Sequence, residues 1–133
     1  MSRTQTRELL MQMVFQMEAQ QNKTIKQMQT LMDDKKISEN EEKYIEYTFK
    51  LLIEHLEDID NLINENSKKW KVNRMPKADL AIVRLAICET IFSEQIPKAV
   101  AINEAVNLAK NYGSEQTPKF VNGLLGKIAD EKD

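Results

Sequence analysis

The stretch ADLAIVRLAICETIF, residues 78–92, is apolar at almost every position. An amphipathic helix buries one stripe, whereas a helix that is apolar all round is buried on every side. The stretch therefore predicts a central helix surrounded by other helices. Pro76 is suited to open it, and Asp79 lies in its first turn, where the helix dipole favours an acid. Arg84 inside the run must either pair with an acid or extend its charged end to the surface.

Amphipathic helical patterns lie on both sides of this stretch. Apolar residues recur at helical spacing in residues 3–20, 24–33 and 98–112, and again from Thr117 onward. The chain has only three glycines and three prolines, which favours helices throughout. We therefore predict an all-α fold, a compact bundle of six or seven helices forming a single domain over residues 1–133.

The segment from residue 37 to residue 67 has its own helical signature. Ser38 and Glu41 form a capping-box pattern at its start. Apolar residues then follow at alternating steps of four and three, as in a coiled coil: Ile45, Phe49, Leu52, Leu56, Ile59 and Ile63. The segment is predicted to pack against other helices, either as one helix or as two helices broken near residues 56–58.

Glycines mark two further positions. Gly113 follows the helix at 98–112 and is predicted to end it as a left-handed C′ residue. The string GLLG at residues 123–126 matches the RNA-clamping loop of KH domains, and with Lys127 it resembles half of a phosphate-binding loop. Both motifs require flanking strands and an exposed loop, which are missing here. Close helix packing at small residues is the favoured explanation.

The residue inventory excludes several classes of site. Cys88 is the only cysteine and His55 the only histidine, so no intramolecular disulfide, no zinc site and no catalytic triad is expected. Cys88 lies in the central apolar run and is predicted to be a core residue. No run of about 18 apolar residues exists, which predicts a cytoplasmic protein with no membrane contact. We expect no enzymatic activity and no cofactor.

Charge is distributed unevenly along the chain. Residues 31–65 carry eleven acids and four lysines, or −7, and the remainder carries +5, which gives the net −2. Arg3 and Arg7 lie at the start of the first helix, where the dipole disfavours bases. Residues 67–77, SKKWKVNRMPK, hold five bases and no acid around Trp70. This pattern is typical either of a nucleic-acid surface or of a tryptophan that anchors a connection, and the anchor is favoured.

Three strings together resemble one protein family. The strings LINENSKKWKVNRMPKADLAIVRLAICETIF, IPKAVAINEAVNLAKNYG and KFVNGLLGKI occur in this order over roughly residues 65–130 and resemble the NusB family of transcription antitermination factors. The N-terminal TRELLMQMVFQME is similar to the family's first helix, though less specifically.

The resemblance implies two packed helical subdomains and no enzymatic activity. Members of the family bind the boxA element of ribosomal RNA leader transcripts together with NusE, a ribosomal protein. The complex joins other Nus factors on RNA polymerase and lets it read through terminators. Some members form homodimers. An adaptor that binds NusE without touching RNA is the alternative.

The resemblance also implies which residues meet RNA phosphates. The family binds RNA along its first helix and at the start of its last helix. Carried over to this chain, Arg3, Arg7, Lys110 and Lys119 are the predicted phosphate contacts. The family's arginine cluster is thinned here to Arg3 and Arg7. Our hypothesis is therefore that the protein alone binds RNA weakly and depends on NusE.

Three further residues receive roles from the resemblance. Phe120 is predicted to stack on an unpaired base, and Asn122 to hydrogen-bond a base edge. The alternative is that Phe120 belongs to the core and that Asn122 fixes the corner between two helices. Asp79 stands where the family has an acid that faces NusE, and it is the predicted partner-binding residue.

Overall fold

The computed structural model describes residues 2–20 and 37–132, and this part of the chain contains helices and no strand. The α-helices are α1 (Arg3–Gln20), α3 (Glu39–Glu54), α4 (Leu56–Asn66), α5 (Lys77–Ile87), α6 (Lys98–Tyr112) and α7 (Thr117–Lys132). A 3-10 turn, η1 (Val72–Arg74), precedes α5, and a π-helical segment, η2 (Cys88–Phe92), continues it. The all-α prediction is confirmed. The helix predicted at 24–33 lies outside the described residues.

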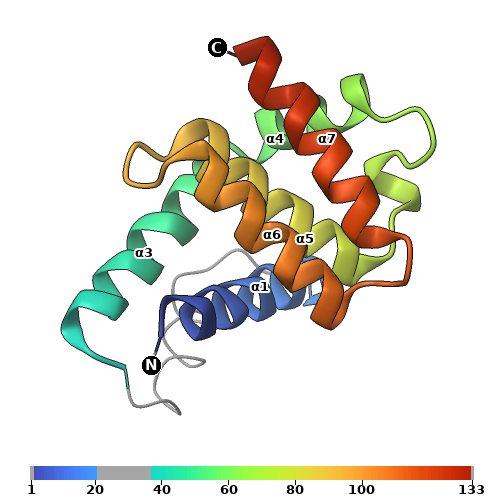
Figure 1. Ribbon diagram of the computed structural model, residues 1–133. Coiled ribbons are helices and arrows are strands. Elements are labelled where there is room, and N and C mark those ends of the chain that lie inside the picture. The colour runs from blue at the N-terminus through green and yellow to red at the C-terminus, as the bar shows by residue number, and fades with distance from the viewer. Residues whose placement is uncertain (1, 21–36, 133) are drawn as a thin grey trace.

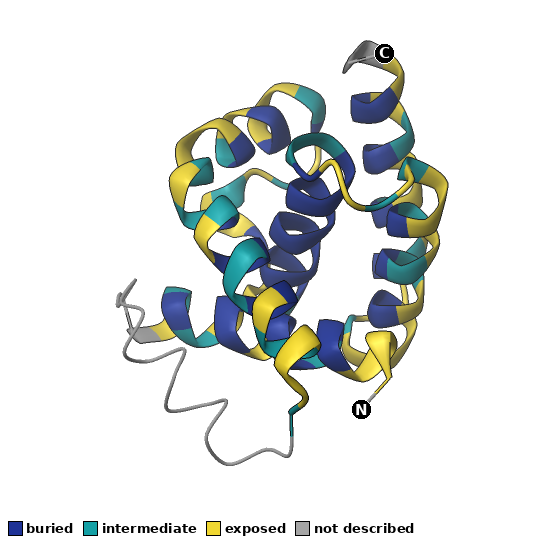
Figure 2. Ribbon diagram, turned by 90° about the vertical axis from the view of Figure 1, so that its left-hand side faces the viewer, coloured by how far each residue is buried: buried dark blue, intermediate teal, exposed yellow. Residues whose placement is uncertain are grey.

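Helix α5 is the centre of the bundle (Figure 1), and it packs against α1, α4, α6 and α7. Nine of its eleven residues are buried, as the all-round apolar pattern predicted. Figure 2 shows this helix dark blue over most of its length. At Cys88 the regular helix ends and the turn widens, so that the Ser93 amide donates to the Cys88 carbonyl at 2.9 Å. The wider turn buries Cys88, Glu89 and Thr90 together.

Arg84 is paired with acids inside the bundle. Its side chain is buried, and its guanidinium donates to both carboxylate oxygens of Asp60 at 2.9 and 2.8 Å and to Glu18 at 3.0 Å. Burial opposes a charged guanidinium, but the hydrogen bonds that it donates to Asp60 and Glu18 outweigh the burial and raise the pKa of Arg84. The interaction joins α1 and α4 to the central helix.

The segment from 37 to 67 forms two helices, not one. Helix α3 ends at Glu54 and α4 begins at Leu56, with His55 between them at φ −108° and ψ 16°. The His55 ring stacks on Phe92 with centroids 4.2 Å apart, which places the break against η2. At the start, the Ser38 hydroxyl accepts from the Glu41 amide, as the capping pattern predicted.

The prediction for Gly113 is wrong. Helix α6 does end there, but Gly113 has φ −90° and ψ −179°, which is extended backbone open to any residue. The glycine is needed because the chain passes too close for a side chain. A Cβ at this position would lie 2.7 Å from the Cβ of Thr117 and 2.9 Å from the carbonyl oxygen of Ala109.

The packing explanation for GLLG is also wrong. Gly123 and Gly126 lie inside α7, and a Cβ built on either glycine meets no atom within 4 Å. No neighbouring helix approaches them closely enough to exclude a methyl group. Both loop motifs are equally inconsistent with a continuous helix, so the two glycines need another explanation.

The described residues contain no candidate metal site, no helix suited to span a membrane and no exposed cysteine. No group of three or more potential ligands that could hold a metal ion occurs among them. None of the described helices is both long and apolar enough to span a membrane. Cys88 is buried in the core, and burial raises the pKa of its thiol. Its predicted place in the core is confirmed.

Replacing Arg84 with methionine tests the buried ion pairs. Arg84→Met fills a similar volume but removes the buried cation that binds Asp60 and Glu18, so we expect the free energy of unfolding to fall by about 3 kcal/mol. Urea unfolding followed by circular dichroism measures the change. Lys43→Met removes an exposed pair with Glu39 and is the control, with an expected change within about 0.5 kcal/mol. Equal effects of the two substitutions would contradict a structural role for Arg84.

Glycine substitutions separate close approach from backbone conformation. Gly113→Ala and Gly113→Asn both place a Cβ against Thr117, so each should lower the free energy of unfolding by about 1–3 kcal/mol. Gly126→Ala in open space should instead raise it by about 0.5–1 kcal/mol. If the asparagine were tolerated and the alanine were not, a left-handed conformation would be the better explanation, because asparagine adopts it readily.

Candidate nucleic-acid interface

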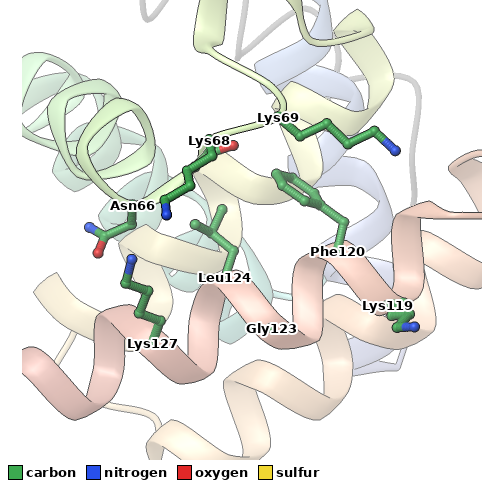
Figure 3. A pocket seen from close by; sticks show the side chains of 9 residues that line it. Asn66, Lys68, Lys69, Lys119, Phe120, Gly123, Leu124 and Lys127 are labelled. Atoms are coloured by element: carbon green, nitrogen blue, oxygen red, sulfur yellow. The ribbon is translucent and has the colours of Figure 1, made fainter.

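One face of α7 forms a groove with the connection that follows α4 (Figure 3). Lys119, Phe120, Gly123, Leu124 and Lys127 lie on this face because they are spaced three or four residues apart or adjacent. We call the depression the basic groove, and its volume is about 330 Å³. It is lined by Asn66, Ser67, Lys68, Lys69, Lys119, Phe120, Gly123, Leu124 and Lys127.

The wall opposite α7 is held in place by bonds to the end of α4. The Lys71 ammonium donates to the carbonyl oxygens of Asn64 and Ser67, at 2.7 Å in each case. These carbonyls would otherwise lack partners, since a helix leaves its last carbonyls unpaired. The Ser67 hydroxyl accepts from the Trp70 amide at 3.1 Å. The connection is therefore fixed, and it presents Lys68 and Lys69 to the groove.

Phe120 lies between the core and the groove. Its ring meets Trp70 edge to face, with centroids 5.2 Å apart, and it is half-buried. The Lys69 ammonium lies 5.6 Å from the centre of the Trp70 ring and donates to the Gln116 side chain at 3.3 Å. Trp70 thus anchors the connection, as favoured from the sequence, and also supports a groove-lining phenylalanine.

A second depression adjoins the basic groove at the Phe120 end. It has a volume of about 590 Å³ and is lined by Lys69, Glu115, Gln116 and Lys119. Lys69 and Lys119 line both depressions, so the two adjoin, and together they make a path over the start of α7. Glu115 is the one acid among the residues that line this path. The residues that line the path therefore carry a net positive charge, which attracts anions.

Asp79 holds the corner from which α7 starts. Its side chain is only 2% exposed, and it accepts from the Thr117 hydroxyl at 3.0 Å. The same hydroxyl accepts from the Ser114 amide at 2.9 Å. Burial raises the pKa of the Asp79 carboxyl, and the bonds from Thr117 and the Ser114 backbone partly offset the shift. The predicted partner-binding acid thus lies beneath the surface and fixes α7 on α5.

Arg7 is likewise an internal residue. It is 4% exposed, and its Nε lies 3.2 Å from both carboxylate oxygens of Glu89. The Tyr44 hydroxyl also donates to Glu89, and the Arg3 guanidinium lies 3.7 Å from the centre of the Tyr44 ring. Burial raises the pKa of Glu89, an effect that Arg7 opposes. Burial, with Glu89 close by, also raises the pKa of Tyr44.

The other predicted site residues are dispersed. Lys110 is exposed on α6, and Asn122 is exposed on α7 but does not line the basic groove. Asn122 follows Phe120 by two residues, about 200° around the helix, so it faces away from the groove. The structure brings Lys119 and Phe120 together. It places Arg3 and Arg7 elsewhere, at the start of α1 beside α3.

Seven of the nine residues that line the basic groove were not predicted as site residues, among them Lys68, Lys69, Gly123 and Lys127. The basic and aromatic stretch at 67–77 contained a signal for the two lysines of the connection. Gly123 and Lys127 both belong to the string GLLGK, for which the sequence favours close helix packing over a binding site. Their common face on α7 follows from helical spacing once the helix is known.

The sequence profile of the NusB family matches residues 4–130 of this chain. The chain belongs to the NusB family. It is 43% identical over 132 residues to a transcription antitermination protein NusB of Alkaliphilus oremlandii, covering 99% of this chain and 96% of that protein. It is 44% identical over 132 residues to the NusB of Thermoanaerobacter pseudethanolicus, covering 99% of this chain and 93% of the relative.

Solved NusB structures share the fold. The T. maritima NusB superposes with a TM-score of 0.89 at 32% identity, covering 98% of this chain and 92% of that one. A complex of antitermination factors NusB and NusE with double-stranded RNA contains a chain of TM-score 0.87 at 21% identity, covering 97% and 96%. At that identity the second likeness shows the fold alone. Family membership makes this chain a transcription antitermination protein of the NusB family and not an enzyme.

Alanine substitutions separate the two N-terminal arginines. Arg7→Ala removes the cation beside the buried Glu89, and we expect it to lower the free energy of unfolding by about 3 kcal/mol. Arg3→Ala removes the contact between the exposed Arg3 and the Tyr44 ring, and it should change the free energy of unfolding by about 1 kcal/mol or less. Urea unfolding of both variants checks this difference. A stability of Arg7→Ala equal to that of the wild type would contradict the internal role of Arg7.

Proposed function

We propose that this protein binds the boxA element of ribosomal RNA leader transcripts as a heterodimer with NusE. In that complex it joins the other Nus factors and supports read-through by RNA polymerase. The observation that carries the proposal is the basic groove, where Phe120 lies between Lys69 and Lys119 at the start of α7. The complex of NusB and NusE with double-stranded RNA, in which the NusB has the same fold, supports an RNA-binding role.

The groove has the two features that single-stranded RNA requires. Phosphates bind cations, and Lys68, Lys69, Lys119 and Lys127 all line the depression. Unpaired bases stack on aromatic rings, and Phe120 is held for this by its edge-to-face contact with Trp70. A ring that is already fixed loses little conformational freedom when a base stacks on it.

The predicted residues take different roles in this proposal. Lys119 meets a phosphate and Phe120 stacks on a base, while Lys110 and Arg3 add exposed positive charge outside the groove. Arg7 acts from inside by holding Glu89 and Tyr44, against whose ring Arg3 lies. The predicted base contact of Asn122 requires a second RNA segment on its side of α7.

The predicted role of Asp79 in binding NusE becomes indirect in this proposal. The carboxylate fixes the corner between α6 and α7 through Thr117. A partner that contacts this corner would depend on Asp79 without touching it.

Fluorescence anisotropy of a labelled boxA-type RNA tests the proposal, with the protein titrated in the presence and absence of NusE. We expect tight binding with NusE and weak binding without it. Phe120→Leu should weaken the complex about tenfold or more because stacking is lost. Phe15→Leu, on an exposed phenylalanine of α1, is the matched control and should leave the affinity unchanged.

The salt dependence of binding reports the number of phosphate contacts. Each lost contact flattens the slope of log affinity against log salt by about 0.7 for single-stranded RNA. Lys119→Ala should show this reduction, and Lys43→Ala on α3 should not. A slope steeper than about −4 for the protein without NusE would contradict weak binding by the protein alone.

The alternative function is an adaptor that binds NusE without RNA contact. The burial of Arg7 favours it, because one predicted phosphate contact is already paired with Glu89. The same titration separates the two functions. NusE association with no RNA binding in either setting would identify the adaptor and leave Phe120 as a core residue.

A further inference from the structure

Gly123 is a glycine for which the fold gives no reason. It lies in the interior of α7, where glycine is destabilising compared with alanine. It is exposed, and a Cβ at this position would meet no atom within 4 Å. Neither a close neighbour nor a turn therefore requires it. What the missing side chain does is leave the floor of the basic groove open.

The groove has charge at both of its ends. In Figure 3 the Lys69 and Lys119 side chains extend past Phe120 at one end. At the other end the Lys68 and Lys127 side chains point toward one another beside Asn66. Phe120 and Lys127 are seven residues apart, which is about 10 Å along the helix. Gly123 and Leu124 form the floor between these two ends.

We propose that the Gly123 end of the groove is a second nucleotide subsite for single-stranded RNA. The sugar and phosphate of the nucleotide next to the one stacked on Phe120 lie over the backbone of Gly123. The phosphate is bound between Lys68 and Lys127, and the sugar packs against Leu124. The subsite rests on the proposed function, which places RNA at Phe120, and it extends the RNA path along α7.

Size, charge and continuity favour RNA as the occupant. The volume of about 330 Å³ is within the usual range for small-molecule sites. Lysine ammonium groups at the rim and an apolar floor complement a nucleotide, whose phosphate is charged and whose sugar has apolar faces. The groove adjoins the depression beyond Phe120, and Lys69 and Lys119 line both.

The subsite does not work as a phosphate-binding loop. In such loops the backbone amides point at the phosphate. The Gly123 amide instead lies inside a continuous helix, where amides bond to the carbonyls of the preceding turn. The glycine therefore contributes space, and the two lysines contribute the charge.

A matched pair of glutamine substitutions in α7 tests the subsite. Gly123→Gln places a neutral side chain in the groove, whereas Gly126→Gln makes the same change at a position that does not line it. Both should raise the melting temperature or leave it unchanged, since glutamine is the better helix former. In anisotropy titrations of labelled boxA-type RNA with NusE present, Gly123→Gln should weaken binding about tenfold and Gly126→Gln less than about twofold.

Lysine substitutions test the charge independently. Lys68→Gln and Lys127→Gln should each flatten the salt slope by about 0.7. If Phe120→Leu weakens binding while Gly123→Gln, Lys68→Gln and Lys127→Gln do not, the subsite is wrong and the proposed function stands. If the wild type binds no RNA with NusE present, both fail. A polyglutamate peptide that competes with RNA at equal charge would mark the groove as a site for acidic peptides and overturn the subsite.

Discussion

The central helix organises the molecule through three charged residues placed five apart. Asp79, Arg84 and Glu89 are all buried in α5 and its π-helical extension. Five residues correspond to about 140° around a helix, so the three side chains leave it on different sides. Asp79 bonds to the start of α7, Arg84 to α1 and α4, and Glu89 to α1 and α3. Because a buried charge must be paired, each one fixes where its neighbours lie.

The buried ion pairs and hydrogen bonds of Asp79, Arg84 and Glu89 determine which charged residues remain on the surface. Glu89 binds Arg7, so of the two N-terminal arginines only Arg3 is exposed. Asp79 positions the corner after Gly113, and the first turn of α7 therefore presents Lys119 and Phe120 beside the α4–α5 connection. Trp70 completes the arrangement by packing on Phe120. The buried bonds of the central helix thus position the elements that form the basic groove, although no residue that lines the groove takes part in those bonds.

Helical spacing predicted the described helices well, because each buries a stripe or a full surface of apolar residues that repeats locally. The sequence left open whether residues 37–67 form one helix or two broken near residues 56–58, and whether Arg84 is paired or extends to the surface. The structure has two helices that meet at His55 and a paired Arg84. The partners of Arg84 did not follow from the sequence, since Glu18 and Asp60 lie 66 and 24 residues away. The groove was missed for the same reason, because Lys68 and Lys127 belong to distant segments. Gly113 was misread because the sequence does not reveal how closely Thr117 approaches.

The position of the positive charge bears on the proposed recognition of RNA. The hypothesis of weak binding counted the arginines of α1, whereas the structure gathers four lysines around the groove. A lysine is a point charge without the planar fork by which arginine binds a phosphate with two bonds. Lysines therefore add affinity with little orientation. In the proposed complex, Phe120 and the shape of the groove would therefore have to orient the RNA. The absence of a side chain at Gly123 would contribute most to that shape.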